Sequence, residues 1–593
     1  MDQRTWPNLV AMYFETAARK ADHPFLWARV GDAYQPLSWR ASADRVSALA
    51  AGLRELGVQK GDRIIVVSEN RPEWLIADVA IMAIGAITVP AYVTNTEADH
   101  LHIATNSGAR GAIVSTRRLA ERFLPAAHKS DDMRFVVAME PPDIDQNLSV
   151  SLHAWDEVIA SGGTGQAEAE AASWGRDDTA CIIYTSGTGG APKGVMLHHG
   201  AILHNCRGAY DALLELGLGD EVFLSFLPLS HSYEHTAGQF FPLSIGAQIY
   251  YAEGIDTLAK NMVEVRPTFM TAVPRLYETL HARLVRGINA KGGLSKRLFE
   301  NAVKLGRKRY EARERLSVGE HVADAILERL VRDKVRRRFG GRLKALVSGG
   351  APLNPDIGLF FTALGLNILQ GYGQTEAAPV ISVNRPNRVK IHTVGPAVID
   401  TDVRIADDGE ILVRGELVMQ GYWRNSEATA EVIRDGWLHT GDVGRVDEDG
   451  YIEITDRKKD IIVNSGGDNV SPQRIEGILT LAPEIAQAMV FGDSRPHLVA
   501  LLVPDEEWSS AWAIEHGKGP ELAALSEDHE LHAALAAIVD SVNGQLSMIE
   551  KVRHFLIARA PFTIDNEQLT PTLKVRRHKI VEIYGDALDA LYH

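Results

Sequence analysis

The sequence predicts an α/β protein, because helical patterns, glycine turns and short apolar strands alternate along its N-terminal part. Between residues 38 and 57, apolar residues recur on one helical face and a glycine ends the pattern. A second glycine turn then leads into an apolar strand at residues 63–68. This helix-turn-strand alternation is typical of helices packed on a sheet. It recurs around residues 112–114, 135–138 and 343–348.

The pattern changes after Gly395. Short strands separated by Asp-Gly pairs predict a small antiparallel sheet or barrel at about 395–455. A basic, glycine-containing run begins at Asp456 and is followed by helical sequence. We therefore predict a main domain at residues 1–455 and a smaller domain at residues 456–593.

Composition narrows the classes of function. A formal net charge of −15 over 593 residues argues against nucleic-acid binding, which needs an excess of lysine and arginine. The two cysteines, Cys181 and Cys206, form no disulfide framework and fit a reducing cytosol. No secretory signal is apparent, so a cytoplasmic protein is expected. The apolar window at residues 74–93 contains Asp78 and is interpreted as a buried helix followed by a strand.

A basic segment interrupts this acidic chain. Residues 283–342 contain 18 lysines and arginines against 7 acidic residues, inside a predicted helical insertion at about 279–342. Three interpretations stay open: a solvated helical face, peripheral contact with anionic lipid at the inner membrane face, and attraction of nucleotide phosphates. The segment could equally contact a second subunit in a homodimer.

The eleven residues from Tyr184 to Gly194, YTSGTGGAPKG, are suited to binding a polyphosphate. Small residues let backbone N–H groups approach anionic oxygens, and Lys193 supplies a cation. The apolar strand before this loop would place it at the carboxyl end of a sheet, where α/β proteins bind ligands. Pro192 precedes the lysine and no Walker A spacing is present, so a generic P-loop ATPase is disfavoured. An ordinary glycine turn is the alternative.

Three further segments contain polar groups beside glycines or apolar runs. Residues 346–352 (LVSGGAP) form a strand that ends in glycines, and residues 370–376 (QGYGQTE) offer an aromatic face and hard oxygen ligands. Residues 227–235 (LPLSHSYEH) place two histidines four residues apart. A zinc site is a weak interpretation of that pair, because no further ligand is suggested.

Together with His439-Thr-Gly-Asp442, Asp456-Arg-Lys458 and Pro571-Thr-Leu-Lys574, these segments resemble the motifs of the adenylate-forming superfamily in the same chain order. That superfamily comprises acyl-CoA synthetases, luciferases and peptide-synthetase adenylation domains. The chain is most similar to bacterial long-chain fatty acyl-CoA synthetases. It departs from the family at Gly189, where a second threonine is usual.

The resemblance implies a large N-terminal domain of layered α/β sheets plus a small distorted β-barrel, followed by a mobile α+β C-terminal domain. It implies Mg²⁺ bound with ATP, held by Glu376 and Thr185, and CoA as cosubstrate. The catalytic residues that it implies are Lys574, Glu376, Thr375 and His231. The ATP-binding residues that it implies are Thr185, Ser186, Gly187, Thr188, Lys193, Gly349, Gly350, Ala351, Pro352, Gly371, Tyr372, Gly373, Thr375, Asp442 and Arg457.

By the same resemblance, Ser465, Gly466 and Gly467 line a CoA tunnel and Asp456 is the hinge. His231, Tyr233 and Glu234 belong to an acyl pocket. Because a charge in an apolar tunnel is costly, we expect Glu234 to be paired, with an arginine of the basic segment as the partner.

The implied activity is ATP-dependent ligation of a long-chain fatty acid to CoA through acyl-AMP and pyrophosphate. Three alternatives are kept: an aryl or medium-chain acyl-CoA ligase, a fatty acyl-AMP ligase that loads a carrier protein, and a non-catalytic nucleotide- or fatty-acid-binding regulator. Retention of Lys574 argues against the regulator, because a protein that only binds has no need of a transition-state lysine.

Overall fold

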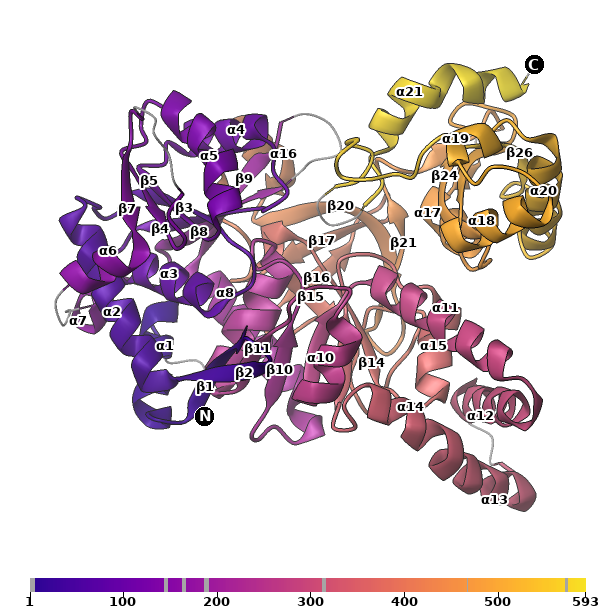
Figure 1. The fold of residues 1–593 in the computed structure, drawn as a ribbon, viewed down its shortest axis with the longest axis horizontal. Helices are drawn as coiled ribbons and strands as arrows, with labels where there is room; N and C mark the ends of the chain where they lie inside the picture. Colours follow the sequence, from indigo (N-terminus) through magenta and orange to yellow (C-terminus); the bar gives the residue numbers. More distant parts are fainter. Residues whose placement is uncertain are drawn as a thin grey trace.

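The computed structural model describes residues 6–142, 148–162, 167–185, 191–311, 316–466, 468–570 and 574–592. The fold consists of two eight-stranded sheets, a five-stranded sheet and a C-terminal group of strands and helices (Figure 1). The predicted α/β class is confirmed.

The first eight-stranded sheet has the order β18-β9-β8-β4-β3-β5-β6-β7 and is parallel from β8 through β4 and β3 to β7. Its predicted strands at residues 63–68, 112–114 and 135–138 are present. The strands are β3 (Arg63–Val67), β4 (Ile87–Ala91), β5 (Gly111–Val114), β6 (Phe135–Ala138), β7 (Ser151–Ala154), β8 (Thr179–Thr185), β9 (Lys193–His198) and β18 (Gly421–Tyr422).

The second eight-stranded sheet has the order β15-β14-β13-β12-β10-β11-β1-β2, with antiparallel pairs only at its two edges. Its strands are β1 (Pro24–Val30), β2 (Ala33–Ser38), β10 (Val222–Ser225), β11 (Gln248–Tyr251), β12 (Phe269–Ala272), β13 (Ala345–Ser348), β14 (Ile368–Gly373) and β15 (Val380–Val383).

One apolar cluster joins the two sheets. It contains Val66 of β3, Phe223 of β10 and most of α3 (Pro72–Ala83). Helix α3 is buried around its circumference, which explains why its sequence shows little amphipathic pattern. The predicted buried helix and strand at residues 74–93 are thus α3 and β4. Among the described helices, none combines the length and apolarity that a membrane crossing requires.

The remaining helices of the N-terminal part cover these sheets and connect their strands. They are α1 (Leu9–Lys20), α2 (Trp39–Glu55), α4 (Glu97–Ser107), α5 (Arg117–Lys129), α6 (Trp155–Ser161), α7 (Ala167–Ala171), α8 (His199–Leu213), η1 (Leu214–Leu216), η2 (Glu234–Phe240), α9 (Phe241–Ile245), α10 (Leu258–Val265), α15 (Pro355–Ala363) and η4 (Thr375–Ala377).

The basic segment folds into helices that project from the second sheet (Figure 1). They are α11 (Pro274–Lys291), α12 (Gly293–Glu311), α13 (Val318–Leu327), η3 (Glu328–Arg332) and α14 (Asp333–Arg338). One of its cations is internal: Arg332 is fully buried and donates to the backbone oxygens of Ala302 and Ala363 and to Asp324. This segment is therefore only partly a solvated surface.

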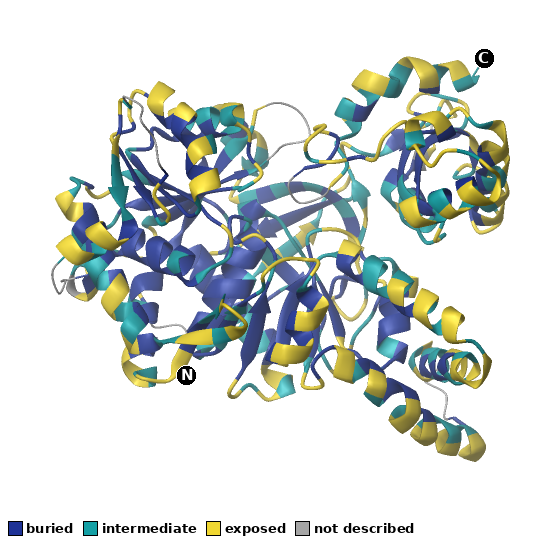
Figure 2. Cartoon of the chain, viewed as in Figure 1, coloured by how far each residue is buried: buried dark blue, intermediate teal, exposed yellow. Residues whose placement is uncertain are grey.

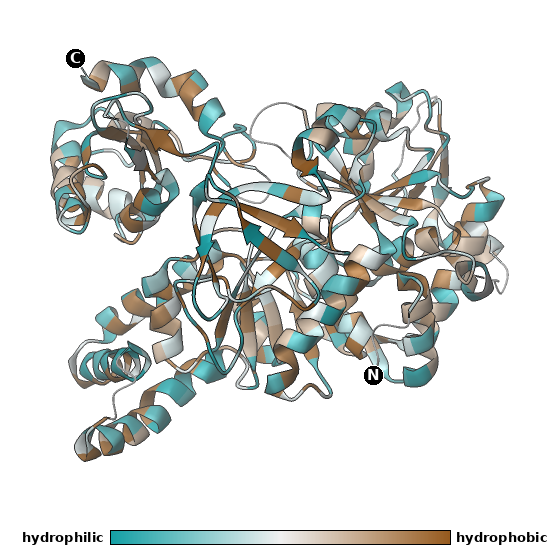
Figure 3. Ribbon diagram, turned by 180° about the vertical axis from the view of Figure 1, so that it is seen from behind, coloured by the Kyte–Doolittle hydropathy of each residue, from teal (hydrophilic) through white to brown (hydrophobic). Residues whose placement is uncertain are grey.

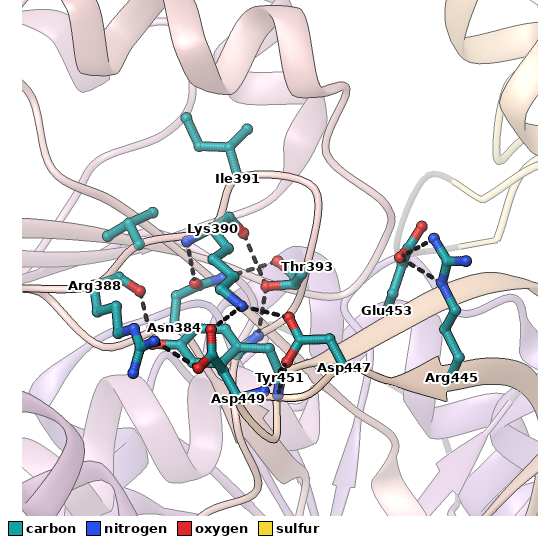
Figure 4. A network of polar contacts seen from close by, with 12 residues as sticks. Asn384, Arg388, Lys390, Ile391, Thr393, Arg445, Asp447, Asp449, Tyr451 and Glu453 are labelled. Atoms are coloured by element: carbon teal, nitrogen blue, oxygen red, sulfur yellow. Dashed lines mark hydrogen bonds and ion pairs between the residues drawn. The ribbon is translucent and has the colours of Figure 1, made fainter. Parts of the chain in front are cut away.

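The predicted sheet or barrel after Gly395 is an antiparallel five-stranded sheet with the order β16-β17-β20-β19, in which β21 pairs with β20. Lys390, in the loop before it, donates to Asp447 and Asp449 at 2.5 and 2.7 Å and fixes the β20–β21 turn (Figure 4). The elements are β16 (Asp402–Ile405), β17 (Glu410–Arg414), α16 (Ser426–Val432), β19 (Ile433–Arg434), β20 (Trp437–Val446) and β21 (Ile452–Arg457).

The C-terminal part has apolar clusters of its own around a three-stranded sheet, and it lies apart from the first sheet (Figures 1 and 2). Its elements are β22 (Ile462–Val463), β23 (Asn469–Val470), α17 (Pro472–Leu479), β24 (Ile485–Phe491), β25 (Leu498–Pro504), α18 (Glu506–Glu515), α19 (Leu522–Leu525), α20 (His529–Asn543), β26 (Val552–Ile557), α21 (Arg577–Asp589) and η5 (Ala590–Tyr592).

Candidate functional site

The glycine loop begins where the sequence predicted, at the carboxyl end of β8. Thr185, the last residue of β8, pairs in register with Lys193 of β9. Ser186, Gly187 and Thr188 lie outside the described residues. The ammonium of Lys193 lies 5.1 Å from the centre of the Tyr422 ring, which holds the cation beside β18.

Tyr422 connects this lysine to the predicted metal-binding residue. Its hydroxyl donates to Oε1 of Glu376 at 2.8 Å, and the preceding residue Thr375 exchanges a 3.0 Å hydrogen bond with the hydroxyl of Ser232. Sequence inspection did not select Tyr422 or Ser232, because both act through contacts between distant segments. The one local feature that could have drawn attention to Tyr422 is its place directly after Gly421 in a short strand.

The donor set around Glu376 fits a cation that arrives with a nucleotide. Mg²⁺ is usually bound by one or two carboxylates together with substrate phosphates and water, and the second oxygen of Glu376 accepts no hydrogen bond from the described side chains. Among those residues there is no cluster of three or more histidines, cysteines or acids that could hold a metal without a substrate.

Gly371 and Gly373, both predicted to bind ATP, also have a packing role that the sequence did not reveal. A side chain at Gly373 would meet the backbone oxygen of Pro379 at 1.7 Å, and one at Gly371 would meet that of Ser382 at 3.0 Å. The glycines therefore permit close pairing of β14 with β15. Gly349 similarly lies against the ring of Tyr233, 3.0 Å from the position of an added Cβ. Gly350 has a left-handed backbone, and Ala351 and Pro352 are exposed beyond it.

Asp442, on β20, is held by two side chains from different parts of the chain. The Tyr372 hydroxyl donates to Oδ2 at 2.6 Å, and Nε of Arg457 donates to Oδ1 at 3.0 Å. Burial, together with the neighbouring Asp442, raises the pKa of Tyr372 well above its usual value. The pairing of β20 with β21 sets Asp442 opposite Arg457, so these two predicted ATP-binding residues lie side by side.

Lys574 lies near the same group. Desolvation by the surrounding protein lowers the pKa of Lys574 to about 8, and the like charge of Arg457 adds to this effect; Asp442 and Glu376 oppose it. The residue itself keeps substantial solvent contact. The Lys574 amide donates to the hydroxyl of Thr570 at 3.0 Å, and the Thr570 amide donates to the backbone oxygen of Lys574. The structure thus brings a C-terminal lysine within electrostatic reach of Asp442 and Glu376.

Of the predicted acyl-pocket residues, Glu234 is the first residue of the π-helical turn η2, and His231 and Tyr233 directly precede that turn. His231 is half-buried, and burial with the charge of Lys574 lowers the pKa of His231 to about 3, so the imidazole is neutral at pH 7. The Tyr233 hydroxyl donates to the backbone oxygen of Val347 at 2.8 Å. Tyr233 therefore lies against β13, and His231 lies within electrostatic reach of Lys574.

The expected arginine partner of Glu234 was wrong. Glu234 is fully buried and accepts hydrogen bonds from the hydroxyls of Ser225 and Thr271 at 2.6 and 2.5 Å. Burial raises the pKa of Glu234 to about 7 against the effect of these hydroxyls. Because the pKa lies near 7, the neutral form is populated at neutral pH, and two hydroxyls can satisfy the group without a buried cation.

Glu234 makes stability depend on pH in a defined direction. The pKa of Glu234 in the folded protein exceeds the ordinary value of 4.5. Its favourable contribution to the free energy of unfolding is therefore fully present below about pH 4.5 and is lost as the pH rises through about 7. Glu234→Gln keeps the shape without the charge. We expect this variant to gain up to about 3 kcal/mol over the parent at pH 8 and little at pH 5, measured by urea unfolding. An equal difference at both pH values would contradict the assignment.

The second histidine of the pair is committed elsewhere. His235 is buried, and its Nε2 lies 2.9 Å from Oδ2 of Asp78, which also accepts from Gln239 at 3.2 Å. This polar cluster inside the apolar core, which sequence inspection did not anticipate, accounts for Asp78 in its apolar window.

The predicted CoA-tunnel residues lie in the C-terminal part. The Ser465 amide donates to the backbone oxygen of Arg495, and the Gly466 amide donates to Asn464. Gly467 lies outside the described residues. Among the described residues, no hydrogen bond or ion pair joins Ser465 or Gly466 to Asp442, Glu376 or Lys574. Asp456 lies inside β21, where its carboxylate accepts from the Arg457 amide at 2.6 Å.

The fold and these groups are those of an enzyme that uses a nucleotide: Lys193 lies on β9 beside the end of β8, Glu376 follows β14, and Lys574 of the C-terminal part lies within electrostatic reach of Glu376. The chain belongs to the AMP-binding enzyme family. The family model for AMP-binding enzymes matches residues 13–423, and the model for their C-terminal domain matches residues 459–593.

Named relatives cover the whole chain. Long-chain-fatty-acid–CoA ligase FadD15 of Mycobacterium bovis is 36% identical over 99% of this chain and 97% of its own length. Long chain acyl-CoA synthetase 6, peroxisomal, of Arabidopsis thaliana is 30% identical over 99% of this chain and 87% of its own.

Solved structures share the fold. The adenylation domain of a carboxylate reductase from Mycobacterium chelonae superposes with a TM-score of 0.76 at 22% identity, covering 99% of this chain and 92% of that one. A benzoate CoA ligase from Burkholderia xenovorans gives 0.71 at 22% identity, over 97% and 99%.

Proposed function

We propose that this protein is an ATP-dependent long-chain fatty acid:CoA ligase that works through an acyl-adenylate. The observation that carries the proposal is the position of Lys574 within electrostatic reach of Asp442 and Glu376. Full-length similarity to named long-chain ligases supports the fatty-acid substrate.

In the first half-reaction, a carboxylate oxygen attacks the α-phosphorus of ATP, and the bond to pyrophosphate breaks. Asp442, fixed by Tyr372 and Arg457, would accept hydrogen bonds from the ribose hydroxyls. Lys193 would bind the outer phosphates, and Lys574 would lie between the two anions as they approach. Mg²⁺ bound with ATP would be held by Glu376, with Thr185 as a further oxygen, and would neutralise phosphate charge.

The neutral state of His231 fits a place beside the acyl carboxylate. An uncharged imidazole can donate one hydrogen bond without pairing permanently with the anion that must react. Tyr233 and Glu234 would form the wall of the acyl pocket behind it, since both are buried and hydrogen-bonded within the protein.

In the second half-reaction, the CoA sulfur attacks the acyl carbonyl carbon, and the bond to AMP breaks. Lys574 must leave for the thiol to enter, so we propose that the domain at residues 456–593 rotates about Asp456 relative to residues 1–455. Ser465, Gly466 and Gly467 would then line the thiol's path. Two reactions at one site require two arrangements of the lid.

Asp456→Pro should affect the two half-reactions unequally. Proline fixes φ and removes an N–H, so it favours one arrangement of the hinge. We expect about a tenfold loss in one half-reaction and a smaller change in the other, measured by pyrophosphate release and by AMP release from supplied acyl-AMP. Asp456→Ala is the matched control, because it removes the carboxylate and leaves the backbone free. Unchanged kinetics in the proline variant would remove Asp456 from the hinge role.

Product analysis tests the function as a whole. The protein is incubated with Mg·ATP and acids from acetate to oleate plus benzoates, with and without CoA, and products are identified by mass spectrometry. Acyl-CoA with AMP, greatest for long chains, is expected. Preference for benzoates or medium-chain acids would indicate an aryl or medium-chain acyl-CoA ligase. Acyl-AMP that persists despite CoA would indicate an enzyme that loads a carrier protein. No AMP with any acid would indicate a non-catalytic regulator.

A further inference from the structure

Helix α13 and the η3 turn that continues it are attached to the protein by ion pairs on one side. Three carboxylates recur every fourth residue and face α12 or the helix end. Glu320 pairs with Lys308 at 2.7 Å, Asp324 with Arg309 and Arg332 at 3.2 and 2.7 Å, and Glu328 with Arg332 and Arg336 at 3.3 and 2.6 Å. Leu327 is the one buried residue within α13. The acidic side of this helix is therefore its inner side.

The apolar side of the same helix faces solvent. Val318, Val322, Ile326 and Leu330 are 84, 59, 52 and 43% exposed; we call them the α13 ridge. A four-residue spacing follows one side of an α-helix with a slow drift. The π-helical turn in η3, where the Asp333 amide bonds to the Glu328 oxygen, offsets part of that drift. Helices of globular proteins normally bury such a stripe.

The position of the ridge makes it available to a large partner. Helix α13 lies at the outer end of the projecting helices (Figure 1), its outer surface is exposed (Figure 2), and apolar and polar residues alternate along it (Figure 3). A shallow hollow of about 420 Å³ is lined by Val322, Ala325, Ile326, Arg329 and Leu330. Aliphatic groups and an arginine thus share one outward surface.

Cations extend this surface. Arg329, Lys334 and Arg337 are exposed, and no ion pair within the described part of the chain involves them. The acids of α13 and η3 are turned inward, so the outward electrostatic character is positive although the whole chain carries −15. Positive charge beside exposed aliphatic side chains is the pattern of a helix that lies in a membrane interface.

We propose that the α13 ridge inserts into the surface of an anionic lipid bilayer, with Arg329 and Lys334 at the headgroups. A second copy of the chain is a poorer occupant, because stable protein interfaces use roughly 20–30 residues a side and the ridge supplies four apolar ones. Each cation near an anionic surface adds attraction that salt weakens. This inference is independent of the ligase activity, since it concerns binding to lipid alone.

The test uses the full chain without ATP, CoA or acid. Cys181 and Cys206 are buried, so Val322→Cys can be labelled selectively with an environment-sensitive fluorophore. Ile514→Cys, at a side chain 75% exposed in the C-terminal part, is the matched control. Vesicles of phosphatidylcholine with about one-third phosphatidylglycerol should shift the emission to the blue at position 322 only. No shift at 322, or equal shifts at both positions, would overturn the proposal.

Vesicle flotation with unlabelled variants gives a second readout. Val322→Ser with Ile326→Ser should lower partitioning into anionic vesicles about tenfold or more, whereas Ile514→Ser should leave it unchanged. Because these side chains are exposed, the variants should keep the parent's unfolding midpoint. Unchanged flotation would refute the ridge as the contact, and loss of a dimer in light scattering with unchanged flotation would assign it to a second copy.

Discussion

Replacing Lys574 by alanine is expected to lower the rate of acyl-AMP formation about 100- to 1,000-fold while thioester formation from supplied acyl-AMP stays within a few-fold of the parent. Removal of one preorganised group that stabilises transition-state charge typically has an effect of that size. Lys574 is placed to act there, since its pKa responds to Asp442 and Glu376. The two halves are separated by measuring pyrophosphate release and, independently, acyl-CoA formation from synthetic acyl-AMP.

Lys579→Ala is the matched control. Lys579 lies in the same basic stretch but pairs at the surface with Glu567 and Glu582, so its loss should leave both half-reactions unchanged. Equal losses of both half-reactions in Lys574→Ala would contradict a role confined to adenylation.

The pH profile supplies a further check on Lys574. Its pKa is lowered to about 8, so the ammonium is present below that value and is lost above it. Adenylation should therefore decline as the pH rises through about 8, and thioester formation from acyl-AMP should not follow the same decline. In Lys574→Arg the alkaline decline should move to higher pH, because the guanidinium stays charged.

Glu376→Gln is expected to produce the second large loss. An amide cannot supply the anionic oxygen that Mg²⁺ prefers, so adenylation should fall by at least the 10- to 100-fold that follows loss of a residue supporting a metal ligand. The apparent affinity for Mg²⁺ should fall with it, and high Mg²⁺ should restore part of the rate. The measurement is pyrophosphate release across a Mg²⁺ titration.

Tyr422→Phe separates charge from orientation in this experiment. It removes the hydroxyl that donates to Glu376 and keeps the carboxylate. The rate of adenylation should therefore fall less in Tyr422→Phe than in Glu376→Gln. A Glu376→Gln enzyme with an unchanged Mg²⁺ dependence would show that the carboxylate orients the turn and does not bind the metal.

Local sequence patterns predicted the α/β class, because apolar runs mark strands and glycine-rich turns with hydroxyls and lysine mark phosphate-binding chemistry. The choice of Glu376, Asp442 and Lys574 as site residues rested on the resemblance of their segments, in chain order, to the motifs of one family. A short-range pattern survives in the one-dimensional chain because the residues that form it are neighbours. The helix-and-strand interpretation of residues 74–93 held for the same reason.

The tertiary structure alone decided which distant groups meet. Tyr422 reaches Glu376 across 46 residues, and Thr271 reaches Glu234 across 37; no local pattern records such contacts, which explains the wrong arginine partner for Glu234. The outward face of α13 is a similar case. Its sequence is an ordinary amphipathic helix, and the burial of Leu327 together with the ion pairs of its acids fixes which side faces water.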